Sequence, residues 1–227
     1  MATRTAAPPT ITLEDLRACT GVATIAALFQ KLRYPVEWPP MDVPLAQEDL
    51  PGKLRDEVTA RYVVADVGDV RASVSVTLFV LRSESEKSSI IRGIAQGWTR
   101  RFAGEHLLVF AVLPTDDHGF RQITFVNTRR LGDGAQVRIK LHKLIVDRLN
   151  PTRHDVETLS AIAIAAGKEA EARAIYQAQC SAFDVERITN EFYKQYAQFF
   201  HAVEQRIKDE NRAIAAFQDD ERLHTFT

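Results

Sequence analysis

The sequence predicts an α/β (α+β) protein in which a mixed β-sheet packs with helices and is followed by a helical C-terminal extension. Residues 70–81 alternate apolar and polar side chains, which is typical of a strand with one buried face. Residues 106–113 are almost entirely apolar, which predicts a central strand covered on both faces. Residues 183–207 repeat apolar side chains at spacings of three and four, which predicts a long amphipathic helix. These patterns divide the chain into an α/β domain, 1–150, and a helical extension, 151–227.

The first element predicted is a helix that begins after Thr12 and runs to about Leu32. Thr12 and Asp15 have the spacing of a capping box, and the proline after Tyr34 ends the helix. Gly21 weakens the middle of this helix. The proline-rich segment that follows, as far as Pro51, predicts an extended surface connection anchored by Trp38.

The remaining elements of the sheet follow in order along the chain. A turn signal at Gly68-Asp69 joins a strand at 61–67 to the strand at 70–81. Apolar residues four apart predict a helix at 90–102, and Gly104 ends it. Two further strands are predicted at 121–127 and 136–146.

The helical extension begins with a second capping signal. Thr152 and Asp155 again have the spacing of a capping box. The alanine-rich residues 156–180 predict two short helices separated near Gly167. The amphipathic helix at 183–207 then needs an apolar surface to cover its stripe.

The composition indicates a soluble cytoplasmic protein. The formal net charge is −1, so the overall charge does not point to nucleic acid. Cys19 and Cys180 have no neighbours at metal-ligand spacing, which predicts reduced thiols rather than a metal site. No signal peptide or membrane-spanning run is predicted.

The motifs of common enzymes are not present in recognisable form. The ten glycines do not form a phosphate-binding loop, and there is no nucleophile elbow. The order of elements resembles the restriction-nuclease sandwich, in which carboxylates hold a divalent metal and a nearby lysine polarises water. This sequence lacks the Glu-x-Lys on the relevant strand, so we expect a degenerate nuclease-like core with no catalytic residues, metal or cofactor. The alternative is a divalent-metal-dependent nuclease using Asp66, Asp69 or Asp147.

Basic residues are concentrated in the middle of the chain. Between residues 82 and 153 there are 13 lysines and arginines against seven acids. Such an excess is typical of contact with nucleic-acid phosphates, but taken alone it favours a solvated face with arginines near a helix C-terminus. The weak DNA-backbone site predicted here comprises Arg100, Arg101, Arg129, Arg130 and Arg153.

The C-terminal half carries a family resemblance. Residues 139–153, 183–196 and 219–227 resemble the N-terminal region of large single-chain, type IIG-like or phage-defence restriction-modification adenine DNA methyltransferases. The helix at 183–207 shares with them a Val-x-x-x-Thr-x-x-Phe-Tyr character, in Val185, Thr189, Phe192 and Tyr193.

The resemblance implies an accessory domain that contacts DNA or serves as a scaffold. S-adenosylmethionine and methyl transfer then belong to a C-terminal methyltransferase domain, since no cofactor loop is found before Thr227. The resemblance also implies that the helix at 183–207 connects to that domain and that some of its aromatic residues are exposed. A pure protein-protein interaction module, or a homodimer formed through this helix, remains the alternative.

Overall fold

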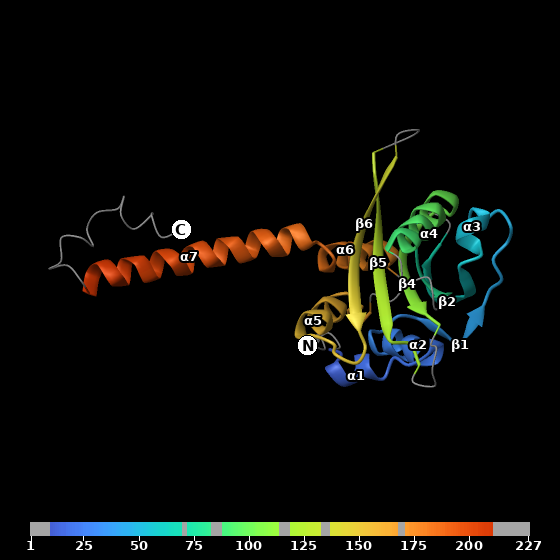
Figure 1. The fold of residues 1–227 in the computed structure, drawn as a ribbon, viewed down its shortest axis with the longest axis horizontal. Coiled ribbons are helices and arrows are strands. Elements are labelled where there is room, and N and C mark those ends of the chain that lie inside the picture. Colours follow the sequence, from blue (N-terminus) through green and yellow to red (C-terminus); the bar gives the residue numbers. More distant parts are fainter. Residues whose placement is uncertain are drawn as a thin grey trace. The chain divides into compact units, whose positions relative to one another are not determined.

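The chain divides into two compact units, Met1–Phe183 and Asp184–Thr227. A computed structural model describes residues 10–69, 72–82, 88–113, 119–132, 137–167 and 171–210, without the side chains of 185–194. In these residues it contains one six-stranded mixed sheet and seven helices (Figure 1). The division after Phe183 lies beyond the predicted boundary at 150/151, because the first two helices of the predicted extension contribute to the core of the first unit.

The strands are ordered in the sheet as they are in the sequence. They are β1 (Val36–Asp42), β2 (Val58–Gly68), β3 (Ser73–Leu81), β4 (Glu105–Val112), β5 (Gln122–Leu131) and β6 (Arg138–Asp147). Only the pairing of β3 with β4 is parallel, and the other neighbours are antiparallel. A helix makes the crossover that a parallel pair requires. We call the edge where β3 and β4 begin the proximal edge, and the edge where they end the distal edge.

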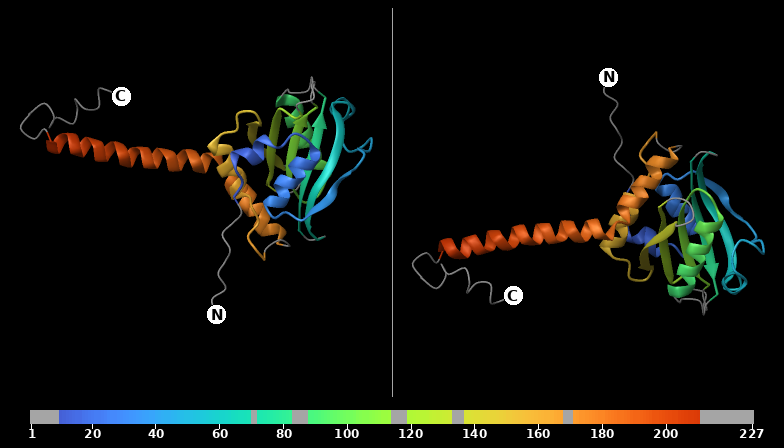
Figure 2. Two further views of the ribbon diagram at one scale, coloured as in Figure 1. Left: turned by 90° about the horizontal axis from the view of Figure 1, so that it is seen from below. Right: turned by 90° about the horizontal axis from the view of Figure 1, so that it is seen from above.

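Helices cover both faces of the sheet. They are α1 (Leu13–Arg17), α2 (Val22–Lys31), α3 (Gly52–Arg55), α4 (Ser88–Arg101), α5 (Arg153–Ala161), α6 (Ala172–Ala182) and α7 (Val185–Glu210). One core includes α1, α2, α5 and α6, and the core on the other face includes α3 and α4. Figure 2 shows α2, in blue, and α6, in orange, on the same side of the sheet. None of the helices in the described residues is long and apolar enough to span a bilayer.

The alternation of side chains explains how the central strands serve both cores. In β4, Leu107 and Val109 belong to the first core, whereas Leu108 and Phe110 belong to the second. The strand is therefore buried on both faces, as its continuous apolar sequence predicts. Phe79 of β3 stacks on Phe110, with ring centroids 5.4 Å apart.

The single helix predicted from Thr12 to Leu32 is wrong, because the structure has two helices there. Thr12 caps α1 as expected, through a capping box with Asp15. A second start follows at Gly21, whose amide donates to Thr24 Oγ1 at 2.9 Å. Gly21 therefore begins α2 rather than lying within one long helix.

The proline-rich connection is also different from the prediction. Its first part forms the edge strand β1, where Pro39 and Pro40 lie in the stretch between Val36 and Met41 in which the pairing with β2 is irregular. Trp38 does not anchor it, since this side chain is 59% exposed.

Other local predictions are confirmed. Gly68 has a φ of +117° and ends β2, and the amide of Asp69 donates to the carbonyl of Ala72 across the turn. Thr152 caps α5 through its capping box with Asp155. The predicted strand start at residues 70 and 71 lies outside the described residues.

Candidate functional site

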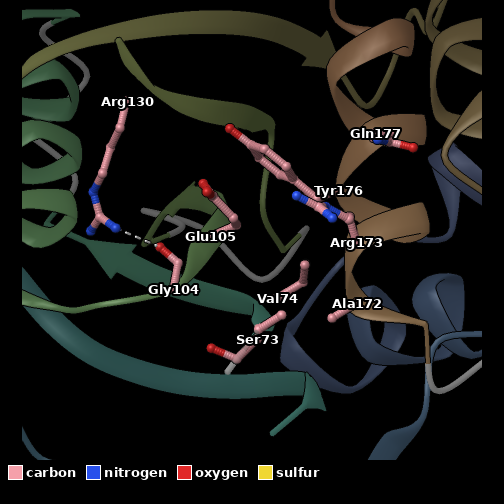
Figure 3. A pocket seen from close by; sticks show the side chains of 10 residues that line it. Ser73, Val74, Gly104, Glu105, Arg130, Ala172, Arg173, Tyr176 and Gln177 are labelled. Carbon is pink, nitrogen blue, oxygen red and sulfur yellow. Dashed lines mark hydrogen bonds between the residues drawn. The ribbon is translucent and has the colours of Figure 1, made fainter. Parts of the chain in front are cut away.

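A cavity of about 480 Å³ lies between the proximal edge and α6. Its lining includes two residues from the start of β3, one from the start of β4, one from the end of β5 and two from α6. These are Ser73, Val74, Glu105, Arg130, Arg173 and Tyr176. Figure 3 shows Glu105 between Arg130 on one side and Tyr176 and Arg173 on the other.

Gly104 sets the position of Glu105 at this edge. It follows the last turn of α4 and has a backbone φ of +89°, which residues other than glycine adopt rarely. A Cβ at Gly104 would lie 2.4 Å from Ser73 Oγ. The close approach of the segments around Gly104 and Ser73 thus requires glycine at residue 104. It brings Glu105 beside the start of β3.

Arg130 uses its guanidinium group to hold the end of α4. It donates to the carbonyl of Gly104 at 3.0 Å and to the carbonyls of Thr99 and Phe102. The last carbonyls of a helix have no partner within the helix, so a cation stabilises them well. Arg130 is therefore a structural cap whose positive charge also lies at the cavity wall.

Tyr176 and Glu105 form the polar part of the cavity wall. The Tyr176 hydroxyl donates to the carbonyl of Thr128 at 3.2 Å. Burial makes the largest contribution to raising the pKa of Tyr176. The neighbouring Cys180 thiol and Glu105 carboxylate raise this pKa further. The Oε2 atom of Glu105 is buried and shielded from solvent.

The residues behind this wall join the sheet to α6 and α4. Arg129 donates to Asn127 Oδ1 at 3.3 Å and to the carbonyl of Cys180 in α6. His106 Nδ1 lies 2.8 Å from Ser75 Oγ, and its Nε2 lies 3.3 Å from the carbonyl of Phe102. Burial, with a smaller contribution from Arg130, lowers the pKa of His106 to about 4. The neutral ring can then donate to Phe102 and accept from Ser75.

The five arginines of the predicted DNA site do not form one surface. Arg129 and Arg130 are engaged by the carbonyls described above. Arg100 and Arg101 are exposed in the last turn of α4. Arg153 lies in α5, has a side chain 90% exposed and pairs with Glu157 at 2.6 Å. Since α4 and α5 pack on opposite faces of the sheet, the exposed arginines are separated.

The carboxylates of the nuclease alternative do not all lie at one edge of the sheet. Asp66 and Asp69 lie at the end of β2, at the proximal edge, whereas Asp147 ends β6 at the distal edge. Asp147 accepts from the Leu149 amide at 3.0 Å and from Asn150 Nδ2 at 3.1 Å. Hydrogen bonding to Asn150 lowers the pKa of Asp147. The described residues include no group of three His, Cys, Asp or Glu side chains that could hold a metal.

Of the charged and aromatic residues that line the cavity, the sequence singled out Arg130 but not Glu105, Arg173 or Tyr176. Glu105 precedes an apolar strand, and Arg173 and Tyr176 lie on one face of an alanine-rich helix, in patterns that also fit ordinary surface positions. Only the packing of α6 across the proximal edge brings them together. Their spacing in the chain carried no usable signal.

Comparisons of the chain with models of known protein families, with curated proteins and with solved structures found no match.

Proposed function

We propose that this chain is a non-catalytic scaffolding domain of a restriction-modification or phage-defence adenine DNA methyltransferase, to which it docks through α7. The observation that carries the proposal is the exposed apolar stripe of that helix. The exposed apolar side chains of its described part are Tyr196, Phe199, Phe200, Val203 and Ile207. S-adenosylmethionine and the methyl-transfer step belong to the methyltransferase.

The stripe is continuous on one side of the helix. At 3.6 residues per turn, these five positions fall within an arc of about 100°, the width of a buried helix face in a globular protein. Phe199 is 68% exposed and Tyr196 is 56% exposed. A stripe of this kind marks a surface that another protein covers.

The α/β unit supports a scaffolding role better than a broad DNA-binding role. Two of the predicted phosphate ligands, Arg129 and Arg130, hold backbone carbonyls instead. The mixed sheet with its helical crossover between β3 and β4 agrees with the expected nuclease-like core. Asp147 lies at the opposite edge of the sheet from Asp66 and Asp69, which favours a degenerate core over an active one.

Co-purification of methyltransferase activity tests the proposal. The tagged full chain, isolated from its native cells, should carry adenine methyltransferase activity, measured as transfer of labelled methyl groups from S-adenosylmethionine to DNA. The double variant Phe199→Asp, Val203→Asp should lose this activity. Gln205→Asp adds a charge on the opposite side of α7 and should retain it. Absence of the activity from the unaltered chain overturns the proposal, and a change from dimer to monomer in the double variant favours a homodimer instead.

Contact with DNA through the end of α4 is a second candidate function. Arg100 and Arg101 are adjacent, exposed and without a partner among the residues that the structure describes. Binding to duplex DNA should weaken as salt rises, because phosphate contacts release counterions. Replacing both arginines with glutamine should reduce that salt dependence, and an affinity that is absent or independent of salt rejects this function.

Incubation of the chain with plasmid and Mg²⁺ or Mn²⁺ tests the nuclease alternative. Plasmid that remains intact at high protein concentration rejects it.

A further inference from the structure

We propose that the hairpin of β5 and β6 is an arm that enters the major groove of duplex DNA. The arm comprises residues 128–131 of β5 and 138–141 of β6. Arg138 and Lys140 contact the phosphates, and Leu131 contacts the edges of the bases. These residues are not those proposed above for α7 and for the end of α4, so the arm depends on neither of those functions.

The arm is a two-stranded ribbon that extends past the rest of the sheet. The pairing of β5 with β4 ends at Asn127 opposite Leu107, whereas its pairing with β6 continues to Leu131 opposite Arg138. Figure 1 shows the two strands continuing together beyond β4. At about 3.4 Å per residue, the arm is roughly 13 Å long, which exceeds the depth of the major groove. That groove is also wide enough to admit a two-stranded ribbon.

The base of the arm is fixed to the two helices beside it. Arg130 donates to the carbonyls at the end of α4, and Arg129 donates to a carbonyl of α6. The hydroxyl of Tyr176, also in α6, donates to the carbonyl of Thr128 at 3.2 Å. The arm is therefore already ordered in the free protein, which reduces the entropic cost of binding.

The arm carries an excess of positive charge. Half of its residues are lysine or arginine, and none is acidic. Arg138 and Lys140 are exposed and share one face of β6, because side chains two residues apart in a strand point the same way. Arg138 makes no hydrogen bond or ion pair in the part of the chain that the structure describes, so its guanidinium group is available for a phosphate. Asp133, between the two strands in the sequence, lies outside the described residues.

The opposite face of β6 also carries cations, just below the arm. Lys143 donates to Ser88 Oγ in α4 at 2.9 Å. Burial, followed by the nearby charge of Arg92, lowers the pKa of Lys143. Two cations held close together favour an anion between them. Positive charge thus lies on both faces of the strand, which suits a groove that has a phosphate backbone on each side.

The tip of the arm exposes apolar side chains. Leu131 is 48% exposed and Val137 is 36% exposed. A duplex matches both the charges and these side chains, because phosphates lie at the rim of the major groove and thymine methyl groups lie within it. An acidic peptide would match the cations alone. The combination therefore favours duplex DNA as the partner.

Fluorescence anisotropy of a short, labelled, A·T-rich duplex titrated with the full chain tests the proposal. The affinity should fall as salt rises, because phosphate contacts release counterions. The single strand of the same sequence has no groove and should bind more weakly. Netropsin, which occupies the minor groove, should not compete. Absence of binding at low salt, equal binding of the single strand, competition by netropsin or equally strong competition by polyglutamate overturns the proposal.

Variants of the arm assign the contacts. The double variant Arg138→Gln, Lys140→Gln should reduce the slope of log affinity against log salt by about two, one for each lost phosphate contact. Leu131→Ser should weaken binding by about tenfold without changing this slope, because it removes only an apolar contact. Arg153→Gln, an exposed arginine in α5, is the matched control and should change neither quantity.

The same assay separates the arm from the end of α4. If replacing Arg100 and Arg101 with glutamine lowers the slope and the arm variant does not, the contact belongs to α4 and the arm is rejected. A lower slope in the arm variant supports the arm whether or not α4 contributes. Thermal melting confirms that each variant folds, and an unchanged slope in a folded Arg138→Gln, Lys140→Gln protein overturns the proposed contacts.

Discussion

The α/β unit and helix α7 carry the same kinds of apolar side chain in opposite environments. In the α/β unit, Phe79 and Phe110 are at most 1% exposed and stack within the core. In α7, Phe199 is 68% exposed. The aromatic residues of the α/β unit thus stabilise its own core, whereas the exposed ring of Phe199 is the basis of the docking proposed above for α7.

The charged groups of the two regions differ in the same way. Arg130 and Arg129 in the α/β unit cap carbonyls and join separate elements. In α7 the charges pair along the helix, as in Arg206 with Glu210 at 2.8 Å. Exposed pairs of this kind contribute little to stability, on the order of 0.3–0.5 kcal/mol for neighbours one turn apart. The free energy of unfolding should therefore respond strongly to changes in the first region and weakly to changes in the second.

The largest expected effect is on the aromatic core. Phe79 is fully buried, stacks on Phe110 and meets Trp98 edge-on, with ring centroids 5.2 Å apart. Phe79→Ala should lower the free energy of unfolding by about 3–5 kcal/mol, because it removes buried surface and leaves a cavity. Urea denaturation followed by far-ultraviolet circular dichroism measures this change. A loss below about 1 kcal/mol would contradict the close packing of this core.

The next effect is a dependence on pH that arises from His106. Its pKa in the folded protein is about 4, whereas an unfolded histidine has a pKa of about 6.5. Between these values the unfolded chain binds a proton that the folded chain does not, so stability falls as the pH decreases from about 6.5 to about 4. The loss should approach about 3 kcal/mol at the acid end of this window.

Matched variants separate this effect from general acid destabilisation. Urea denaturation across the window should show a smaller slope in His106→Gln. His201 in α7 has a side chain 75% exposed, so His201→Gln should leave the slope unchanged. Equal slopes in all three proteins would show that His106 is not the source.

Much of the α/β unit could be predicted from local patterns. The apolar run of β4 and the capping box of Thr152 each depend on residues close in sequence, and both predictions are confirmed. The break between α1 and α2 was harder to predict. A glycine such as Gly21 is compatible both with a weak point inside one helix and with the start of a second helix. The contact of the Gly21 amide with Thr24 favours the new start.

The candidate site depends on contacts between distant residues. Glu105 and Tyr176 are neighbours only because α6 packs over the proximal edge. Arg130 illustrates the same limit, since a count of charges cannot show that its guanidinium group is used by the carbonyls at the end of α4. Sequence patterns therefore predicted the elements, whereas the cavity required their arrangement in space.

A smaller effect is expected at the start of α5. The Thr152 hydroxyl accepts from the Asp155 amide at 3.2 Å. Thr152→Ala should reduce the free energy of unfolding by about 1 kcal/mol, since it leaves a helix amide without its capping partner. Arg153→Ala, next in sequence, removes only an exposed ion pair and should cost less than about 0.5 kcal/mol. Thermal melting of the two variants side by side measures the difference, and equal losses would argue against a specific capping effect.

The smallest effect is expected in α7, where the comparison with the core is most direct. Phe199→Ala removes the same side chain as Phe79→Ala, but from an exposed position, so the free energy of unfolding should change by no more than about 0.5 kcal/mol. Gln205→Ala, on the opposite side of the helix, controls for helix propensity. A loss above about 1 kcal/mol in Phe199→Ala alone would show that the stripe is covered in the isolated protein. Such a loss would depend on protein concentration if a second copy covered the stripe, because association couples stability to concentration. A loss that is independent of concentration would instead place the stripe against the same chain, and α7 would then not be free to dock on a methyltransferase.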